Sequence, residues 1–379
     1  MSRIFLIGDT HISLGYPNTV EKWHKIHVEY FDNFLIPLLK KEVKKGDIVA
    51  HLGDLFDNRS IIPINLLNYG MDIIEKISSI APLHILIGNH DLWTKSASEI
   101  NTIRPFKYIP NVFIYDSPKK IEYNGKSILM MPYIDKKRDQ IEILKKYSGC
   151  DYLFCHSDLN GAKMHLTSVA HKNLDKIDVE EFSGYKIVKT GHIHIRQSID
   201  NVEFVGNTFE MDRNDRDNQK GITILDTSDD TQIFVPNLVS PKFKKVYLSK
   251  EDDIDNLDNY STKDYIDLFI SNSLLINNRK LRRKLEQMLE NGNFATVEYL
   301  DDISDVRDEK IKDINGDIIM ENTNQEIESS SIGLEYKDII RNYISDKKWD
   351  SEKIKNGIIQ EFNEVLNIYE NNYKLKIDE

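Results

Sequence analysis

The chain has 379 residues, a formal net charge of -12, 40% hydrophobic and 30% charged residues, which indicates a soluble globular protein with two or three folded units. Because no apolar stretch is long enough for a membrane helix and no signal-peptide pattern follows Met1, we expect a cytoplasmic protein without membrane contact. The acidic balance argues against a protein that coats nucleic acid through bulk charge, and the two cysteines argue against a disulfide framework.

Strands and helices alternate in the predicted first half of the chain. Apolar residues at helical spacing predict a helix over 21–45, which Pro37 should kink, and Pro63 suits the first turn of a second helix that ends near residue 80. Asn124-Gly125 is a strong hairpin signal. Short apolar runs predict strands at 4–7, 48–52, 84–87, 112–115, 120–123, 127–131, 152–155, 186–190, 202–205, 221–226 and 232–235. This pattern favours an α/β unit with two sheets.

Acid, amide and imidazole side chains follow five of these runs. The carboxyl ends of strands in a layered α/β fold converge on one crevice, so the spacing predicts one site. Carboxylate, amide and neutral imidazole ligands suit manganese, magnesium, iron or zinc. Asp54 is the natural bridge between two such ions, and His90 is free to face a substrate as an acid. The five clusters are Asp9-Thr10-His11, Gly53-Asp54-Leu55-Phe56-Asp57, Gly88-Asn89-His90-Asp91, His156 and Gly191-His192-Ile193-His194.

The pattern changes after Pro236-Asn237 and Ser240-Pro241. Strands at 244–248, 265–271 and 295–300, with a basic helix at 278–290, predict a small α+β unit. Residues 301–331 are acidic and polar, which is typical of a linker, and two amphipathic helices should follow. The densest basic cluster makes three arginines candidates for contacts with DNA phosphates, namely Arg279, Arg282 and Arg283.

The five motifs, D-x-H, GDxxD, GNHD, a solitary histidine and GHxH, resemble the signature of calcineurin-like metallophosphoesterases. This resemblance implies a four-layer α/β/β/α sandwich with a dinuclear metal site at one edge. It implies that His90 is the catalytic acid and that Asp91 orients His90. The implied ligands are Asp9, His11, Asp54 and His194 for one ion, and Asp54, Asn89, His156 and His192 for the other.

Further features resemble the SbcD or meiotic-recombination-eleven family of nuclease subunits, in its bacteriophage-type branch. They are GDLFD, Phe204-Val205-Gly206-Asn207, and the segment 156–161, which is similar to HxELNG but has Asp158 in place of glutamate. The resemblance implies a nuclease domain over 1–238, a small α+β capping domain over 239–305, an acidic linker over 306–333 and C-terminal helices over 334–379.

The same resemblance implies an activity and partners. The chain would be a manganese-dependent DNA nuclease subunit of a recombination and repair complex, exonucleolytic on double strands and endonucleolytic on single strands. Its C-terminal helices would bind a coiled-coil ATPase of the SbcC or Rad-fifty type, and two copies would form a homodimer.

Alternatives stay open at this point. The chain could be a small-molecule or cyclic-nucleotide phosphodiesterase whose C-terminal region covers the site or mediates dimerisation, or a scaffold with a relic site. The capping and terminal regions could instead be an ordinary appended α+β domain and a packed helical hairpin. A protein phosphatase is disfavoured, because such enzymes typically read GDxVDRG and GNHE, whereas this chain has Asn58-Arg59 in the first motif and Asp91 in the second.

Overall fold

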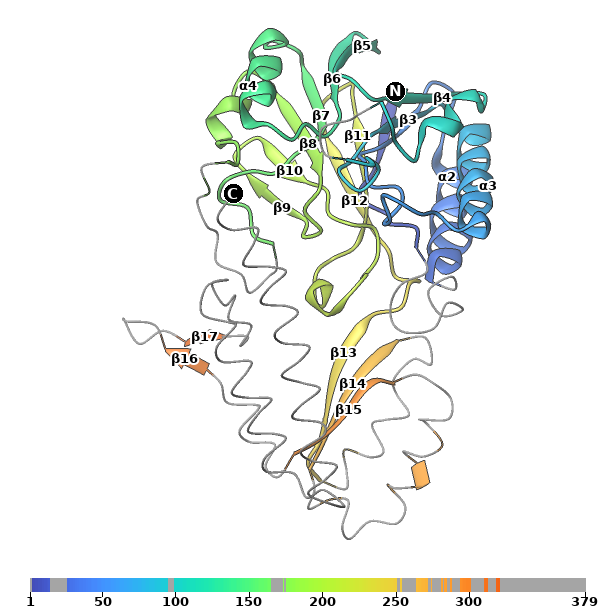
Figure 1. The fold of residues 1–379 in the computed structure, drawn as a ribbon, viewed down its shortest axis with the longest axis vertical. Helices are drawn as coiled ribbons and strands as arrows, with labels where there is room; N and C mark the ends of the chain where they lie inside the picture. The colour runs from blue at the N-terminus through green and yellow to red at the C-terminus, as the bar shows by residue number, and fades with distance from the viewer. Residues whose placement is uncertain are drawn as a thin grey trace, which may run out of the picture. The chain divides into compact units, whose positions relative to one another are not determined.

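The computed structural model describes the core of the chain and several later segments (Figure 1). The described residues are 2–13, 26–94, 99–164, 173 and 175–250, then 264–271, 294–300, 310–312 and 318–320, with isolated positions such as Arg283. The predicted C-terminal helices over 334–379 lie outside them.

The first sheet has six strands in the order β12-β11-β1-β2-β3-β4. Strands β1 to β4 run parallel, β11 is antiparallel to β1, and β12 is antiparallel to β11. The central strands are buried on both faces, which explains their unbroken apolar runs. Their bounds are β1 Arg3–Ile7, β2 Ile48–His51, β3 Leu83–Leu86, β4 Val112–Tyr115, β11 Gly221–Asp226 and β12 Gln232–Pro236.

The second sheet also has six strands, in the order β5-β6-β7-β8-β10-β9. Strands β6, β7, β8 and β10 run parallel, and the edge strands β5 and β9 are antiparallel to their neighbours. The predicted second sheet is therefore confirmed. Its bounds are β5 Lys119–Tyr123, β6 Lys126–Met131, β7 Tyr152–His156, β8 Ile187–Gly191, β9 Gln197–Ile199 and β10 Val202–Phe204.

Three clusters of buried side chains account for the packing. One joins apolar residues of both sheets, such as Leu6 of β1 and Phe154 of β7. A second packs the helices α2 and α3 on the first sheet, and a third packs α4 with the second sheet. The mixed α/β class with two large sheets is confirmed, and these clusters are consistent with the predicted α/β/β/α order (Figure 1).

The helices depart from the predictions in detail. The predicted helix over 21–45 is interrupted by a π-helical turn, Phe31–Leu35, where the N–H of Ile36 bonds to the carbonyl of Phe31 ahead of Pro37. Helix α4 was not predicted, because only Gln140 and Leu144 of this lysine-rich segment are buried. The helices are α2 Ile36–Glu42, α3 Ile64–Ile80 and α4 Lys137–Lys146, with 3-10 turns at Arg104–Tyr108, Val179–Phe182 and Arg213–Asp215.

A smaller parallel sheet follows the core. It consists of β13 Phe243–Leu248, β14 Tyr265–Ser271 and β15 Phe294–Leu300, close to the strands predicted there. The predicted basic helix over 278–290 lies largely outside the described residues. An antiparallel pair, β16 Lys310–Lys312 and β17 Ile318–Met320, falls within the segment predicted as an acidic linker.

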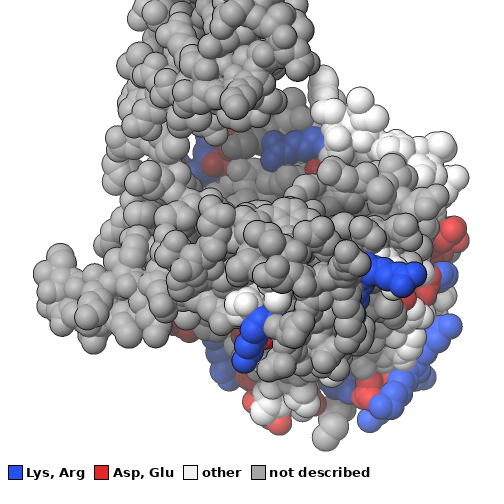
Figure 2. All heavy atoms as spheres, turned by 90° about the horizontal axis from the view of Figure 1, so that it is seen from below, with Lys and Arg blue, Asp and Glu red and all other residues white. Residues whose placement is uncertain are grey.

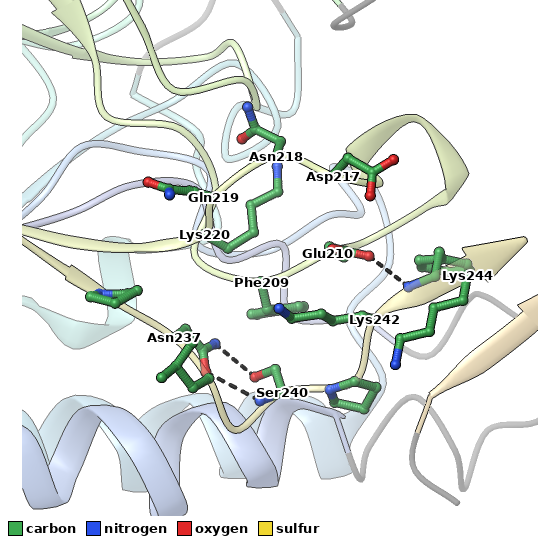
Figure 3. A pocket seen from close by; sticks show the side chains of 14 residues that line it. Phe209, Glu210, Asp217, Asn218, Gln219, Lys220, Asn237, Ser240, Lys242 and Lys244 are labelled. Carbon is green, nitrogen blue, oxygen red and sulfur yellow. Dashed lines mark hydrogen bonds between the residues drawn. The ribbon is translucent and has the colours of Figure 1, made fainter. Parts of the chain in front are cut away.

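The loop between β10 and β11 contacts the smaller sheet directly. Arg213 and Arg216 both bind the carboxylate of Asp267 on β14, at 2.9 and 2.7 Å. Glu210 accepts a 2.6 Å hydrogen bond from the backbone N–H of Phe243 on β13. Figure 3 shows the hollow between this loop and β13, which has a volume of about 350 Å³.

Charges of both signs are interspersed on the face drawn in Figure 2, where lysine and arginine side chains of described residues lie beside aspartate and glutamate. Among the described residues, no helix combines the length and the apolar character needed to cross a membrane.

Candidate metal centre

The predicted ligands follow the carboxyl ends of five parallel strands from both large sheets. Asp9 and His11 follow β1, Asp54 follows β2, and Asn89 follows β3. From the second sheet, His156 is the last residue of β7, while His192 and His194 follow β8. Because the two sheets pack face to face, residues up to 185 positions apart meet at one edge, as the spacing predicted.

One group of ligand atoms combines Asp9, His11 and His194. The Nε2 atoms of His194 and His11 lie 3.1 Å apart. The carboxylate of Asp9 lies 3.8 Å from Nε2 of His194, and it also accepts the backbone N–H of His192 at 3.0 Å. Asp9 is completely buried, so this carboxylate sits at the base of the group.

A second group combines Asp54, His156 and His192, together with the amide of Asn89. Oδ1 of Asn89 lies 2.9 Å from Nε2 of His156 and 2.7 Å from Nδ1 of His192. Without an ion, the opposite amide orientation would satisfy more hydrogen bonds. The orientation with oxygen towards both imidazole nitrogens is the one that a cation between them requires.

Asp54 joins the two groups. Its Oδ2 lies 3.6 Å from Nε2 of His11 and 3.3 Å from Nε2 of His156. Ligand atoms bound to one ion at about 2.0 to 2.2 Å lie roughly 3 Å apart when they are at right angles. The separations of 3.1 to 3.6 Å between these donors therefore fit two neighbouring cations that share the carboxylate of Asp54.

Two motif glycines are required by the close approach of ligands. A Cβ at Gly88 would lie 2.2 Å from Oδ1 of Asp54, and a Cβ at Gly191 would lie 2.6 Å from Oδ1 of Asp9. Any side chain at either position would displace a predicted ligand.

The ligand loops have unusual backbone conformations. His11, Asp54 and His192 have φ of 41°, 55° and 80°, in the left-handed region that residues other than glycine rarely adopt. Such conformations persist only where surrounding contacts impose them, and they cluster at functional sites. The backbone thus turns these three side chains towards the two groups of ligand atoms.

The four histidines of the centre fall into two classes, two with a raised pKa and two with a lowered pKa. Burial opposes protonation of His11 and His156, but neighbouring carboxylates outweigh it and raise the pKa of each imidazole to about 9. Burial lowers the pKa of His192 to about 4 and of His194 to about 3. Burial alone would raise the pKa of Asp54, but His156 and the other imidazoles hold it well below its usual range.

His90 lies at the edge of this centre with a side chain that is 35% exposed. Its Nδ1 donates to the backbone carbonyl of Asp57 at 2.8 Å, and its own backbone N–H donates to Oδ1 of Asp54 at 2.7 Å. The carboxylate of Asp57 also lies 3.6 Å from Nδ1 of His90 and 3.3 Å from Nδ1 of His11. Asp57 therefore positions His90, a role the sequence analysis did not assign although it quoted Asp57 within its motif.

The predicted orientation of His90 by Asp91 is corrected. The side chain of Asp91 points into the core, where it is fully buried. It accepts the backbone N–H groups of Gly88, Asp54 and Leu55 at 2.9, 2.8 and 3.1 Å. Asp91 thus ties the turn that carries Asp54 to the loop that carries Asn89, and acts on the ligands instead of on His90.

A hollow of about 610 Å³ opens beside Asn89 and His192. Tyr133, which the sequence analysis also missed, packs its ring on His192 with centroids 6.0 Å apart. Four cations line this hollow together with Tyr133, namely Arg59, Lys136, Lys137 and Lys176, and three aspartates line it as well, namely Asp135, Asp158 and Asp175. The hollow beside the centre therefore carries charges of both signs, and Lys137 and Lys176 are paired with Asp178 and Asp158 at 3.2 and 2.9 Å.

Of the three arginines predicted to contact DNA, the structure describes only Arg283. Arg279 and Arg282 lie outside the described residues, and Arg283 is exposed.

A family model described as calcineurin-like phosphoesterase matches residues 2–196. The chain is similar to Exonuclease subunit 1 of Enterobacteria phage T4, with 26% identity over 245 residues, or 62% of this chain and 68% of the phage protein. It is also similar to the DNA double-strand break repair protein Mre11 of Methanocaldococcus jannaschii, with 25% identity over 201 residues, or 50% of each chain. A solved archaeal phosphodiesterase matches with 14% identity and a TM-score of 0.33, over 62% of this chain and 99% of that one, a likeness too weak to support an argument.

Proposed function

This chain belongs to the calcineurin-like phosphoesterase family, a family of hydrolases that use two divalent metal ions, and on that premise we propose that it is a manganese-dependent DNA nuclease subunit. It would cleave double strands exonucleolytically and single strands endonucleolytically. The protein would act in the cytoplasm within an SbcCD-like recombination and repair complex.

The observation that carries a two-metal hydrolase is the position of Asp54. One carboxylate oxygen lies within 3.6 Å of a histidine from each group of ligand atoms, so a single side chain can join two ions. Asp9, His11 and His194 would complete one site, and Asn89, His156 and His192 the other. Two bound divalent ions lower the pKa of water and neutralise charge that develops on a phosphoryl group.

The remaining chemistry falls to His90. Because Nδ1 donates to the carbonyl of Asp57, the ring is fixed and Nε2 is left for the substrate. A protonated His90 can then donate from Nε2 to the oxygen that leaves when the phosphodiester bond breaks. Asp57 keeps the ring in place, and Asp91 holds the turn of Asp54 beside it.

DNA is the proposed substrate for two reasons. The phage T4 relative is an exonuclease subunit, and the archaeal relative is a double-strand break repair protein. In addition, Arg59 and Lys136 line the hollow beside Asn89 and His192, and neither is paired with a carboxylate among the described residues, so both would be available to a phosphodiester backbone. Further phosphate contacts are proposed for Arg279, Arg282 and Arg283.

Partner binding is proposed on the resemblance alone. The helices expected over 334–379 would bind a coiled-coil ATPase, and two copies of the chain would pair. Capture of such an ATPase by the full chain, with loss of capture after deletion from Gly333 onward and retained cleavage, would support this assignment. Equal capture by both forms would contradict it.

The activity is tested by one panel of substrates with added manganese. Linear duplex DNA, circular single-stranded DNA, cyclic AMP and a phosphopeptide are given to the wild type and to His90→Ala, Asp54→Asn and His84→Gln. We expect cleavage of both DNAs, a loss with His90→Ala and Asp54→Asn, and no loss with His84→Gln, because His84 stacks on Tyr115 away from the ligand atoms. Hydrolysis of cyclic AMP alone would replace the nuclease by the small-molecule phosphodiesterase, and full activity of Asp54→Asn would favour the relic scaffold.

A further inference from the structure

A second hollow lies next to the metal centre and has no part in the chemistry above. It has a volume of about 400 Å³ and is lined by Arg59, Ser60, Trp93, Ile100, Asn101 and Thr102. Trp93 is 55% exposed and Ile100 is 52% exposed. An exposed indole at the edge of an active site is a large apolar surface, and burying it in a ligand would be favourable.

The segment that carries Trp93 is tied to the ligand loops. The backbone N–H of Trp93 donates to the carbonyl of Ile100 at 3.1 Å. In the same pair of antiparallel segments, the backbone N–H of Thr102 donates to the carbonyl of Asp91 at 2.9 Å. Since Asp91 holds the turn of Asp54, the indole stands on a support that is continuous with the metal centre.

The distance from the reacting groups suits one nucleotide. Trp93 follows His90 by three residues, so their Cα atoms can be at most about 11 Å apart. That limit places the indole within reach of a base attached to the phosphodiester at the metal centre. Trp93 is the only tryptophan among the residues that the structure describes.

Arg59 connects the two hollows. Its side chain lines both the hollow beside Asn89 and His192 and the hollow beside Trp93. Nη2 of Arg59 lies 3.2 Å from the outer atom of the Asn89 amide, which is Nδ2 when Oδ1 faces the imidazoles, so the guanidinium lies beside a predicted ligand without a hydrogen bond to it. Within the described part of the chain, no carboxylate pairs with Arg59, which leaves its charge for a phosphate.

We propose that this hollow is a nucleobase subsite, in which Trp93 stacks on an unpaired base of the strand being cut while Arg59 binds the adjoining phosphate. The inference rests on the proposed function and adds to it a preference for melted or single-stranded ends. An aromatic platform beside a backbone cation is the arrangement by which proteins hold single-stranded nucleic acid without reading its sequence. The lining of the hollow combines two apolar side chains, three neutral polar ones and the guanidinium of Arg59, which suits the face and edges of a base.

A second copy of the chain is the competing occupant. A stable dimer interface buries roughly 800 Å² on each partner, far more than one indole and one isoleucine provide. The guanidinium of Arg59 in the wall also favours an anionic ligand. We therefore commit to the base, and the oligomeric state becomes one outcome of the test.

The test compares the protein variants on DNA with and without bases. Single-stranded oligoadenylate and a tetrahydrofuran-phosphate oligomer of equal length share the backbone, but only the first has bases. Removing a stacking aromatic should weaken binding and lower kcat/KM by about 5- to 150-fold. We expect a loss in this range for Trp93→Ala on oligoadenylate, at least 5-fold larger than its loss on the base-free oligomer, and near-recovery in Trp93→Phe.

Matched controls and a direct signal complete the design. Tyr108→Ala removes an aromatic ring that is 80% exposed but does not line the hollow, and it should show no difference between the two oligomers. Oligoadenylate should quench tryptophan fluorescence of the wild type, and Trp93→Phe should lose that part of the quenching. The chain contains three tryptophans, so the difference between these two proteins reports on Trp93.

Each result has a defined meaning. Equal losses of Trp93→Ala on both oligomers, with a wild type that cleaves DNA, would overturn the subsite and leave the nuclease intact. Failure of the wild type to bind or cleave either oligomer would overturn the nuclease and the subsite together. Conversion of a wild-type dimer to a monomer by Trp93→Ala in sedimentation, without a base-dependent loss, would assign the hollow to a second copy.

Discussion

The substitution Lys220→Met should strongly destabilise the protein, because it leaves a buried charge without its partner. Lys220 and Asp215 are 6% and 3% exposed, and their charged atoms lie 2.6 Å apart. Burial alone would raise the pKa of Asp215, but the ammonium of Lys220 outweighs it and holds this pKa below its usual range. Removing one partner of a buried pair costs about 3 to 5 kcal/mol, a large part of the typical 5 to 15 kcal/mol of stability.

Lys220→Met should also weaken metal binding. Nζ of Lys220 also donates to the backbone carbonyl of His194 at 2.9 Å, so the substitution frees the loop that carries this ligand. We therefore expect weaker metal binding in titration calorimetry, together with a lower urea midpoint at an unchanged slope. The matched control is Arg138→Met, which breaks an exposed ion pair on α4 and should leave the midpoint unchanged.

The pH dependence makes this prediction refutable. In the wild type, the lowered pKa of Asp215 means that its contribution is present above about pH 4 and is lost below. Without Lys220, the pKa of the buried carboxyl should rise, and its protonation should relieve the penalty. The difference in the free energy of unfolding between the wild type and Lys220→Met should therefore become smaller as the pH falls from 7 towards 4. Adding Asp215→Asn to Lys220→Met should restore part of the stability. The reasoning would be refuted if Lys220→Met lost no more free energy of unfolding than Arg138→Met, or if its loss stayed constant between pH 7 and pH 4.

Three further predictions follow from the centre and from the loop beside it. His90→Ala should lower kcat by about 10² to 10⁴ while two ions still bind, which metal analysis alongside kinetics would check; loss of an ion would instead make His90 a ligand. Metal affinity should increase between pH 6 and pH 9, because cations must displace the protons of His11 and His156, whose pKa values lie near 9; a pH-independent affinity would contradict these protonation states. Burial raises the pKa of Glu210 to about 7, so the folded state binds more protons than the unfolded state between about pH 4.5 and 7, and stability should fall as the pH rises through this window. Glu210→Gln keeps the hydrogen bond to the backbone and should abolish that fall in urea denaturation, whereas a persisting fall would assign it to another group.

The strand ends could be predicted from the sequence, because short apolar runs and the polar residues after them depend on local pattern. Strand β4 agrees with its prediction at both ends, and the ligands of β1, β2 and β8 follow their strands as expected. These features need no knowledge of side-chain direction. Convergence at one edge then follows from the parallel arrangement of the strands.

The contacts within the turns could not be predicted in this way. Asp57 and Asp91 both lie in quoted motifs, yet the first contacts His90 and the second binds backbone N–H groups. The turn between these residues includes the left-handed conformation at Asp54, which aspartate adopts only occasionally, so the sequence pattern does not indicate which side chain turns inward. The sequence analysis therefore expected Asp91 to orient His90, whereas Asp57 is the residue that contacts the His90 side chain.

Other differences have identifiable local causes. The π-helical turn before Pro37 keeps the helical spacing of apolar residues, so the pattern alone cannot separate it from an α-helix. The strands β16 and β17 flank Asn315-Gly316, a hairpin signal that the acidic composition of the segment obscured.

Protonated imidazoles supply positive charge in this centre when no cation is bound. His11 and His156 favour the protonated state because Asp9, Asp54 and Asp57 surround them, whereas burial keeps His192 and His194 neutral. Both protonated rings lie near the same oxygen of Asp54, Oδ2, and one belongs to each group of ligand atoms. Each site thus offers a proton that a divalent ion can replace, so binding changes the local charge by one unit instead of two for each ion.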